Sequence, residues 1–251
     1  MNTARLRILG ALMIATAVIA NTGFALLGAQ FDYPAILQEP AAKILDEFHG
    51  NAATIGALFA LLAVGAALLI PIARLTADVI DHQKPNLRRV VLVAGAAAGI
   101  VQVIGLLRWP LLVPHYADVV TDPSTSVAAR ADAIDTFRTL HSVLGGLVGE
   151  TLGYTLTATW TLAVVFGIAA IYKPGRWFAP LGIGAAALIA TGVLVPIGVP
   201  GAGLANFAGY IAWSAWVIGF AVSLVRHSPA VDGPNHQQAR PPVLETAVAP
   251  T

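Results

Sequence analysis

The residues that decide the fold run from Ala52 to Leu75 and read AATIGALFALLAVGAALLIPIARL, with a single charged side chain, that of Arg74. An α-helix rises about 1.5 Å per residue, so about 20 apolar residues span the roughly 30 Å of bilayer hydrocarbon. This stretch is therefore long enough and apolar enough to form one membrane-spanning helix.

Further segments of the same character flank it on both sides, and they are Ile8–Ala29, Val90–Val113, His141–Ile171, Phe178–Pro200 and Leu204–Val225. Lipid cannot satisfy backbone polar groups, so only helices and closed barrels cross membranes, and these runs lack the alternation of barrel strands. The sequence predicts an all-α polytopic membrane protein with six transmembrane helices, in one membrane domain of residues 1–226. Residues 227–251 lack periodicity and predict a disordered cytoplasmic tail.

Composition excludes several classes of protein. Of the 251 residues, 57% are hydrophobic and 11% charged, whereas a soluble domain carries about 25% charged residues. The formal net charge of +1 provides no basic field to hold nucleic acid. The apolar composition instead predicts a lipid bilayer as the surroundings of the protein. Because the chain has no cysteine, disulfides, thiolate metal sites and cysteine nucleophiles are excluded.

The distribution of lysine and arginine predicts the orientation. These residues gather in segments 74–89 and 173–176, whereas segments 30–51 and 114–140 are rich in Asp and Glu. Cytoplasmic loops carry the excess of positive charge, so both termini are predicted to be cytoplasmic. Segments 30–51 and 114–140 are then outer loops, and both are long enough to have structure.

Each outer loop contains one amphipathic pattern. In the first loop, Ile44, Leu45 and Phe48 share one face of a short predicted helix. In the second loop, apolar residues from Val127 to Ile134 repeat at helical spacing. We expect that second helix to lie along the membrane surface and to lead into the fourth span.

Ionisable side chains inside a membrane helix cost roughly 2.5–3.5 kcal/mol each on insertion scales, so they indicate function. Glu150 lies about nine residues into the fourth predicted span, and Tyr154 follows it on the same helix face. Arg108 lies near the outer end of the third span. Either the two charges form an ion pair that ties two helices together, or they are the charged groups of a ligand site. Arg108 has a further alternative, which is to extend toward the outer headgroups.

Three more polar residues lie inside predicted spans, and they are Gln102, Asn206 and Tyr210. Gln102 lies deeper in the third span than Arg108, and Asn206 and Tyr210 lie in the outer half of the sixth span. Hydrogen bonds between helices are the alternative role for each. Together with the charged residues they predict an outward-facing polar cavity lined by the third, fourth and sixth spans. The predicted ligand-binding residues are Arg108, Glu150, Tyr154, Asn206, Tyr210 and Gln102.

Glycines recur every four residues on the other side of the fourth span, at Gly145, Gly149 and Gly153. Small residues at this spacing let a neighbouring helix approach closely. The ridge therefore predicts close packing, and it is a candidate surface for a partner membrane helix.

Histidines raise the alternative of a metal ion or a haem, with His49, His115 and His141 as the candidate ligands. Imidazole and carboxylate ligands suit zinc, manganese or iron. The sequence has no His-Glu-x-x-His pattern, so no cofactor and no catalytic residue is predicted.

Three stretches resemble a known family: LRWPLLVP (107–114), LHSVLG (140–145) and GETLGYTLTATWT (149–161). They are similar to a group of actinobacterial multi-pass membrane proteins classified under a bacterial domain of unknown function. The resemblance covers roughly residues 5–225 and implies a six-helix protein of the bacterial inner membrane. It includes Arg108, His141, Glu150 and Tyr154, and it implies no reaction.

Three functional hypotheses follow. The first is binding or transport of a small ligand, with Arg108 and Glu150 setting the charge of the site. The second is a membrane-embedded redox or metal-dependent enzyme that uses the histidines. The third is a non-catalytic subunit of a membrane complex.

The orientation can be tested with reporter fusions. We expect a reporter fused after Arg89 or Lys173 to be cytoplasmic and one inserted near Asp122 to lie outside, because cytoplasmic loops carry the positive charge. Alkaline phosphatase and fluorescent protein activities report the two locations. A periplasmic signal from the Lys173 fusion would contradict the six-span topology.

Overall fold

The computed structural model describes residues 3–80, 84–172 and 174–226, so the predicted tail of residues 227–251 lies outside the described residues. Within these ranges all regular structure is helical and no strand occurs, which confirms the predicted fold class. The elements are α1 (Thr3–Phe31), η1 (Ala35–Gln38), α2 (Ala41–Gly50), α3 (Ala52–Ala67), α4 (Leu69–Val79), α5 (Pro85–Leu111), α6 (Val113–Thr121), α7 (Val127–Leu140), η2 (His141–Leu152), α8 (Gly153–Tyr172), α9 (Phe178–Ala190), η3 (Thr191–Ile197) and α10 (Ala202–Arg226). Elements η1 and η3 are 3₁₀-helices and η2 is a π-helix.

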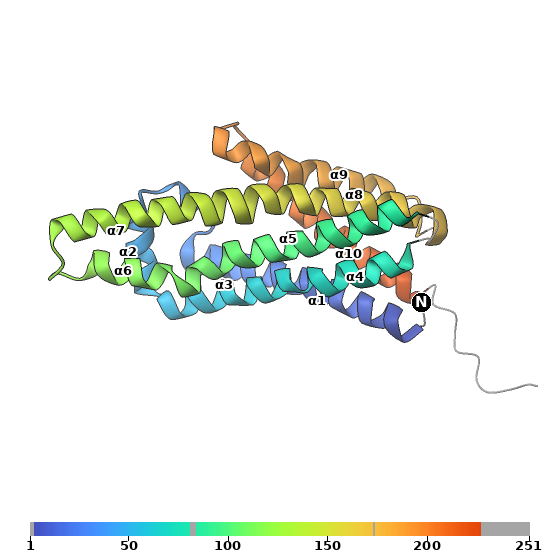
Figure 1. The fold of residues 1–251 in the computed structure, drawn as a ribbon, viewed down its shortest axis with the longest axis horizontal. Helices are drawn as coiled ribbons and strands as arrows, with labels where there is room; N and C mark the ends of the chain where they lie inside the picture. The colour runs from blue at the N-terminus through green and yellow to red at the C-terminus, as the bar shows by residue number, and fades with distance from the viewer. Residues whose placement is uncertain (1–2, 81–83, 173, 227–251) are drawn as a thin grey trace, which may run out of the picture.

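Six segments of the described chain are long and apolar enough to cross a membrane, as predicted. They are Thr3–Phe31, Ala52–Val79, Pro85–Thr121, Val127–Ile168, Phe178–Ile197 and Ala202–Arg226. Figure 1 shows them side by side along the long axis of the molecule. We call the end that carries α2, α6 and α7 the α7 end, and the opposite end, where α1 begins and α10 finishes, the terminal end (Figure 1).

The helix α7 does not lie along the membrane surface, so that expectation was wrong. Figure 1 shows α7 and α8 as parts of one continuous rod, joined through η2. The rod from Val127 to Ile168 is 42 residues long, or about 60 Å, roughly twice the hydrocarbon thickness. It packs on α6 and α2, and this packing buries Ala133 and Phe137, while Val127 at its start is exposed.

The predicted amphipathic helix of the first outer loop is confirmed as α2. Its apolar residues Ile44, Leu45 and Phe48 are all buried. The Phe48 ring lies 5.8 Å from the Trp109 ring, which stacks on Phe59 at 4.7 Å between centroids. Aromatic packing therefore fixes α2 across the α7 end of the bundle.

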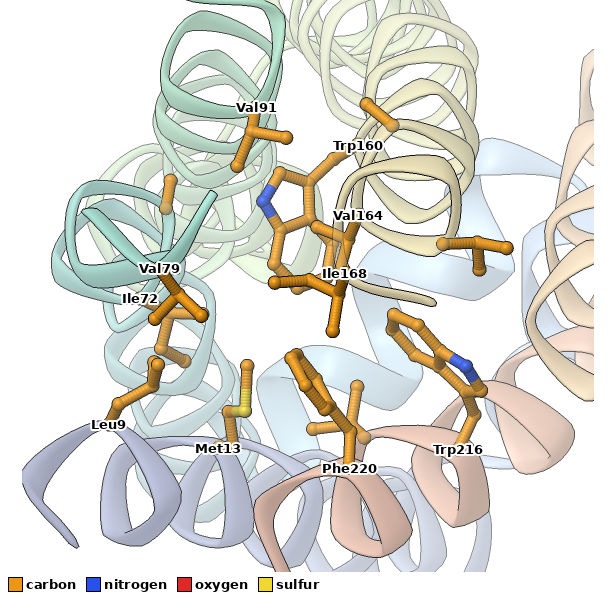
Figure 2. Close-up of a cluster of buried hydrophobic side chains, with 14 of the residues drawn as sticks. Leu9, Met13, Ile72, Val79, Val91, Trp160, Val164, Ile168, Trp216 and Phe220 are labelled. Carbon is orange, nitrogen blue, oxygen red and sulfur yellow. The ribbon is translucent and has the colours of Figure 1, made fainter. Parts of the chain in front are cut away.

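Neighbouring helices close a ring around the apolar core of the terminal half. In this ring α1 packs on α3 and α10, α5 packs on α3, α4, η2 and α8, and α9 packs on α8 and α10. Figure 2 shows the side chains that fill its centre: Leu9, Met13, Ile72, Val79, Val91, Trp160, Val164, Ile168, Trp216 and Phe220. The terminal half of the bundle is thus packed with apolar side chains.

The predicted glycine ridge lies in and beside η2, and its close neighbour is α5. A Cβ atom on Gly149 would lie 2.9 Å from the Cα of Gly105, and one on Gly153 would lie 3.0 Å from Cγ of Gln102. The backbones of α5 and η2 therefore meet at Gly105 and Gly149, without an intervening side chain. The predicted close packing is confirmed, while a partner helix from another protein at this ridge stays a prediction.

Alanine substitutions test this backbone contact. We expect Gly149→Ala to destabilise the fold by about 1–3 kcal/mol, because its methyl group overlaps backbone atoms that cannot rotate away. The control is Gly184→Ala, since no atom lies within 4 Å of a Cβ built at this position on α9. There, alanine improves helix propensity by up to about 1 kcal/mol. Thermal unfolding in detergent measures both, and equal effects would contradict a special contact at Gly149.

Candidate ligand-binding site

Arg108 lies in the last turn of α5, close to the contact with η2, and the residue is 6% exposed. Two glycines make room for it there. Its Nη1 donates a hydrogen bond to the Gly105 carbonyl oxygen one turn earlier. A Cβ atom on Gly145 would lie 2.6 Å from Nη2 and 2.7 Å from Cζ, so the missing side chain of Gly145 provides the space that the guanidinium occupies.

The guanidinium has unpartnered nitrogen atoms. Nε and Nη2 are buried and have no hydrogen-bond partner among the described residues. Nor does any carboxylate in the described ranges lie within 4.0 Å of the guanidinium nitrogens. The Arg108 ring contact is with its chain neighbour Trp109, 5.2 Å from Cζ to the ring centroid. A fixed positive charge is therefore buried without a counter-ion in the described part of the chain.

The free nitrogens share one edge of the guanidinium. Nε and Nη2 donate in parallel along that edge, which is how arginine binds both oxygens of a carboxylate or phosphate. A Cβ on Gly145 would lie nearer to Cζ, at 2.7 Å, than to Nε, at 3.1 Å. An atom that blocked the donating edge would lie nearer to both Nε and Nη2 than to Cζ, and this Cβ position does not. Gly145 therefore covers a face of the guanidinium and not its donating edge.

Glu150 lies in η2, and within the described residues its carboxylate makes no direct ion pair with Arg108. It is nevertheless within electrostatic reach of the Arg108 guanidinium. It also acts electrostatically on the phenols of Tyr33, Tyr154 and Tyr210. A negative and a positive charge thus lie near each other without forming a direct salt bridge.

Tyr33 lies with Arg108 and Glu150, although the sequence did not predict it as a site residue. It lies between α1 and η1, and its ring packs on Phe59 at 5.4 Å and on Phe24 at 5.9 Å. Burial, and after it the Glu150 carboxylate, hold the pKa of the Tyr33 phenol well above its ordinary value of 10.0. Because the phenol stays protonated, it remains a hydrogen-bond donor. The sequence feature that could have indicated Tyr33 as a site residue is its position between the end of a predicted span and a proline.

Tyr154 and Tyr210 bring α8 and α10 into the same cluster. Their ring centroids lie 5.9 Å apart at an interplanar angle of 62°. The Tyr210 hydroxyl is hydrogen-bonded to Thr157. Gln102 Nε2 on α5 donates a hydrogen bond of 3.1 Å to Thr157 Oγ1. Gln102, Thr157 and Tyr210 therefore connect three helices, so the predicted ligand residue Gln102 already has a protein partner.

Asn206 also has a protein partner. Its Nδ2 donates a hydrogen bond of 2.7 Å to the Ile189 carbonyl oxygen, where α9 gives way to η3. A helix end leaves carbonyl groups without intrahelical partners, and a side-chain amide can satisfy one of them. Asn206 therefore fixes the junction between α9 and η3, and this structural role needs no ligand.

The candidate metal ligands are dispersed among different contacts. His49 Nδ1 lies 3.2 Å from an Asp118 carboxylate oxygen, and the His115 ring packs on Tyr116. His141 is within electrostatic reach of Arg108, and its ring lies 6.1 Å from that of Trp109. Within the described residues no group of three or more His, Asp or Glu side chains could hold a metal ion. A haem or metal enzyme stays a hypothesis.

A surface pocket of about 370 Å³ lies elsewhere, at the end of α1, and it is lined by Gly28, Ala29, Gln30, Phe31, Asp32, Ile36, Glu39, Lys43 and Glu47. These residues belong to the first span and to the segment that follows it, which is predicted to be the first outer loop. The predicted cavity, by contrast, was placed between the third, fourth and sixth spans. The charged and phenolic side chains of those spans do converge, and with Tyr33 they form a polar cluster of Tyr33, Arg108, Glu150, Tyr154 and Tyr210. Arg108 is buried, and the other four residues are half-buried.

Comparison with known families adds one identification. A model of a domain of unknown function, DUF4386, matches residues 8–226, which include every helix that carries the polar cluster. The chain belongs to the DUF4386 family. Neither a curated protein nor a solved structure matches it. The DUF4386 match covers the six candidate spans almost completely, and it assigns no activity to them.

The unpartnered state of Arg108 has a measurable consequence. We expect Arg108→Met to raise the stability of the ligand-free protein by about 1 kcal/mol or more, because it puts an apolar side chain in place of a buried charge that has no direct ion-pair partner in the described chain. For a protein of this size that is roughly 2–4 °C in the unfolding midpoint.

The control is Arg88→Met at the start of α5. Arg88 donates from Nε to the Ala77 carbonyl oxygen at 3.0 Å, and its Nη2 lies 3.5 Å from Asp78. Its loss should therefore lower stability. Thermal unfolding in detergent compares the two variants. If Arg108→Met destabilised the ligand-free protein as much as Arg88→Met, Arg108 would be a structural residue.

Proposed function

We propose that this integral membrane protein binds a small ligand with an anionic group, and that Arg108 holds this group. One observation carries the proposal. Arg108 is 6% exposed, and the Nε and Nη2 of its guanidinium are buried and have no partner in the described chain. A buried charge without a partner costs several kcal/mol. Such an arrangement is retained where a ligand supplies the missing counter-charge.

Carboxylate and phosphate groups fit this edge best. Both present two oxygens that match two parallel N–H donors, and arginine provides this geometry where lysine does not. Two more buried nitrogens close to Arg108 have no partner among the described residues, namely Trp109 Nε1 and His141 Nδ1. Buried polar groups are nearly always hydrogen-bonded, so their concentration at one level also supports a ligand there.

The arrangement of the bundle favours binding over passage through the protein. The core residues of Figure 2 fill the terminal half, and Tyr154 and Tyr210 of the polar cluster pack against this core. The side chains that Figure 2 labels there are apolar except for the indole nitrogens of Trp160 and Trp216. We expect the α7 end to face outward from the cytoplasmic membrane of an actinobacterium, as the loop charges and the resemblance indicate.

Ligand-dependent stability tests the proposal. Anything that binds the folded state raises its stability by RT ln(1 + [L]/Kd), about 2.7 kcal/mol at a hundredfold excess over Kd. We expect at least one of acetate, 3,3-dimethylbutanoate, phosphate and methyl phosphate to raise the unfolding midpoint of the purified protein. Differential scanning fluorimetry in detergent measures the shift at constant ionic strength.

Three variants complete this experiment. Arg108→Met should abolish the shift, and Gly145→Ala should reduce it, because a methyl group there displaces the guanidinium. Arg88→Met should retain it, since Arg88 is an arginine outside the cluster. An equal shift in wild type and Arg108→Met would mean that the anion binds elsewhere and would refute this assignment.

A further inference from the structure

The polar cluster holds one basic and one acidic side chain, Arg108 and Glu150, and the two form no direct ion pair in the described chain. We propose that its ligand is a zwitterion, whose carboxylate or phosphate binds Arg108 and whose ammonium group binds Glu150 among the rings of Tyr33, Tyr154 and Tyr210. This inference rests on the proposed function and names the chemical class of the ligand.

The balance of charge separates a zwitterion from a simple anion. Arg108 and Glu150 are close enough to act on each other, yet no Glu150 oxygen lies within 4.0 Å of the guanidinium. A simple anion would neutralise Arg108 and leave the half-buried carboxylate of Glu150 without a partner. A ligand with both signs pairs with both residues and adds no net charge to a buried site.

The surroundings of Glu150 suit an ammonium group. Three phenols lie within its electrostatic reach, and they come from the segment after α1, from α8 and from α10. The Tyr154 and Tyr210 rings pack edge to face, with their centroids 5.9 Å apart and an interplanar angle of 62°. Aromatic faces attract cations, and rings arranged around a carboxylate are a typical site for alkylated ammonium groups.

Tyr33 gives the site a side that is not part of a transmembrane helix. Its flanking residue Asp32 has a positive φ of 48°, and Pro34 follows, so α1 ends there and the chain turns back. The Tyr33 phenol acts electrostatically on both Arg108 and Glu150. A single phenol is thus placed beside both charges that the zwitterion would contact, and it donates a hydrogen bond while it stays protonated.

The required chemistry, an ammonium joined to a carboxylate or a phosphate, has two sources in a membrane. One is a free solute, such as an amino acid derivative or a betaine. The other is the headgroup of a zwitterionic phospholipid of the outer leaflet. Both place opposite charges a few bonds apart, so the same residues would recognise either.

The test uses the purified full-length protein and three probes of nearly equal shape. Glycine betaine carries both charges, 3,3-dimethylbutanoate has the carboxylate with a neutral tert-butyl group, and choline has only the ammonium. We expect betaine, or phosphocholine as the phosphate counterpart, to bind at least tenfold more tightly than the singly charged probes. Isothermal titration or thermal shift measures the affinities.

Variants show which residue makes the distinction. Glu150→Gln should remove the tenfold preference and leave betaine and dimethylbutanoate with similar affinities, because the partner of the ammonium is gone. Arg108→Met should abolish binding of every probe. Glu47→Gln, on the exposed face of α2, is the control and should change neither affinity nor preference.

The outcomes distinguish this inference from the proposed function. If dimethylbutanoate binds through Arg108 as tightly as betaine, and Glu150→Gln weakens neither, the anion site stands and the zwitterion is refuted. If neither the soluble probes nor the lipids described below act through Arg108, both proposals fail.

A lipid arm identifies the source. The protein is reconstituted in nanodiscs of phosphatidylcholine or of anionic phosphatidylglycerol, and bound lipid is counted by native mass spectrometry. Retention of phosphatidylcholine that is lost in Glu150→Gln supports a headgroup as the ligand. Binding of soluble betaine or phosphocholine without such retention supports a free solute. Retention of phosphatidylglycerol alone, through Arg108, refutes the zwitterion.

Discussion

The backbone contact between α5 and η2, at Gly105 and Gly149, is the constraint on which the rest of the structure depends. A Cβ on either glycine would lie under 3.0 Å from the other residue's Cα. At this separation no side chain fits between the helices at the contact itself. The long Arg108 side chain, one turn further along α5, lies along the interface beside it. Gly145 and Gly105 receive it, the first by its missing side chain and the second by its carbonyl oxygen. The close approach thus explains why a charge can be buried here, and it does not neutralise that charge.

The two halves of the bundle differ in the interactions that hold them together. In the terminal half, tryptophan and phenylalanine rings from α8, α9 and α10 pack on one another, with Trp216 Nε1 donating to the Phe178 carbonyl oxygen at 2.9 Å. In the other half, a second aromatic cluster that includes Phe48, Phe59 and Trp109 packs beside the polar side chains. Proteins commonly break packing and pairing rules at functional sites while the remainder of the fold supplies the stability. The apolar terminal half fits that supporting role.

The sequence was most informative about the spans and least informative about what the polar side chains contact. Six apolar runs predicted six helices because lipid imposes length and composition on each of them. Their ends were less predictable, since α6 and α7 continue the helices of two spans beyond the apolar run. Hydrophobic periodicity alone placed α7 on the membrane surface. The helix packs on α2 and α6 instead, and that choice depends on residues far away in the chain.

The polar residues show the same limit. Arg108, Glu150, Tyr154 and Tyr210 do converge, because each interrupts an apolar helix at a similar depth. Asn206 and Gln102 have the same sequence signature, yet each has a partner that arises from tertiary structure: the end of α9 and the Thr157 hydroxyl. Tyr33 was missed because its position depends on how the chain turns after α1. The π-helix was also unforeseen, since an i, i+4 pattern of glycines does not distinguish it from an α-helix.

α7, η2 and α8 form one continuous helical rod, so a small rotation of the rod at one point moves its far end by a larger distance. Val127, at its tip, precedes Glu150 by 23 residues, or about 35 Å along the axis. A stiff rod converts a small angle into a large displacement, so a tilt of about 5° at Glu150 moves the tip by about 3 Å at that length. A spectroscopic label near Val127 would therefore magnify any reorientation of the helix that carries the half-buried carboxylate. Because the chain contains no cysteine, one introduced cysteine is enough to attach it.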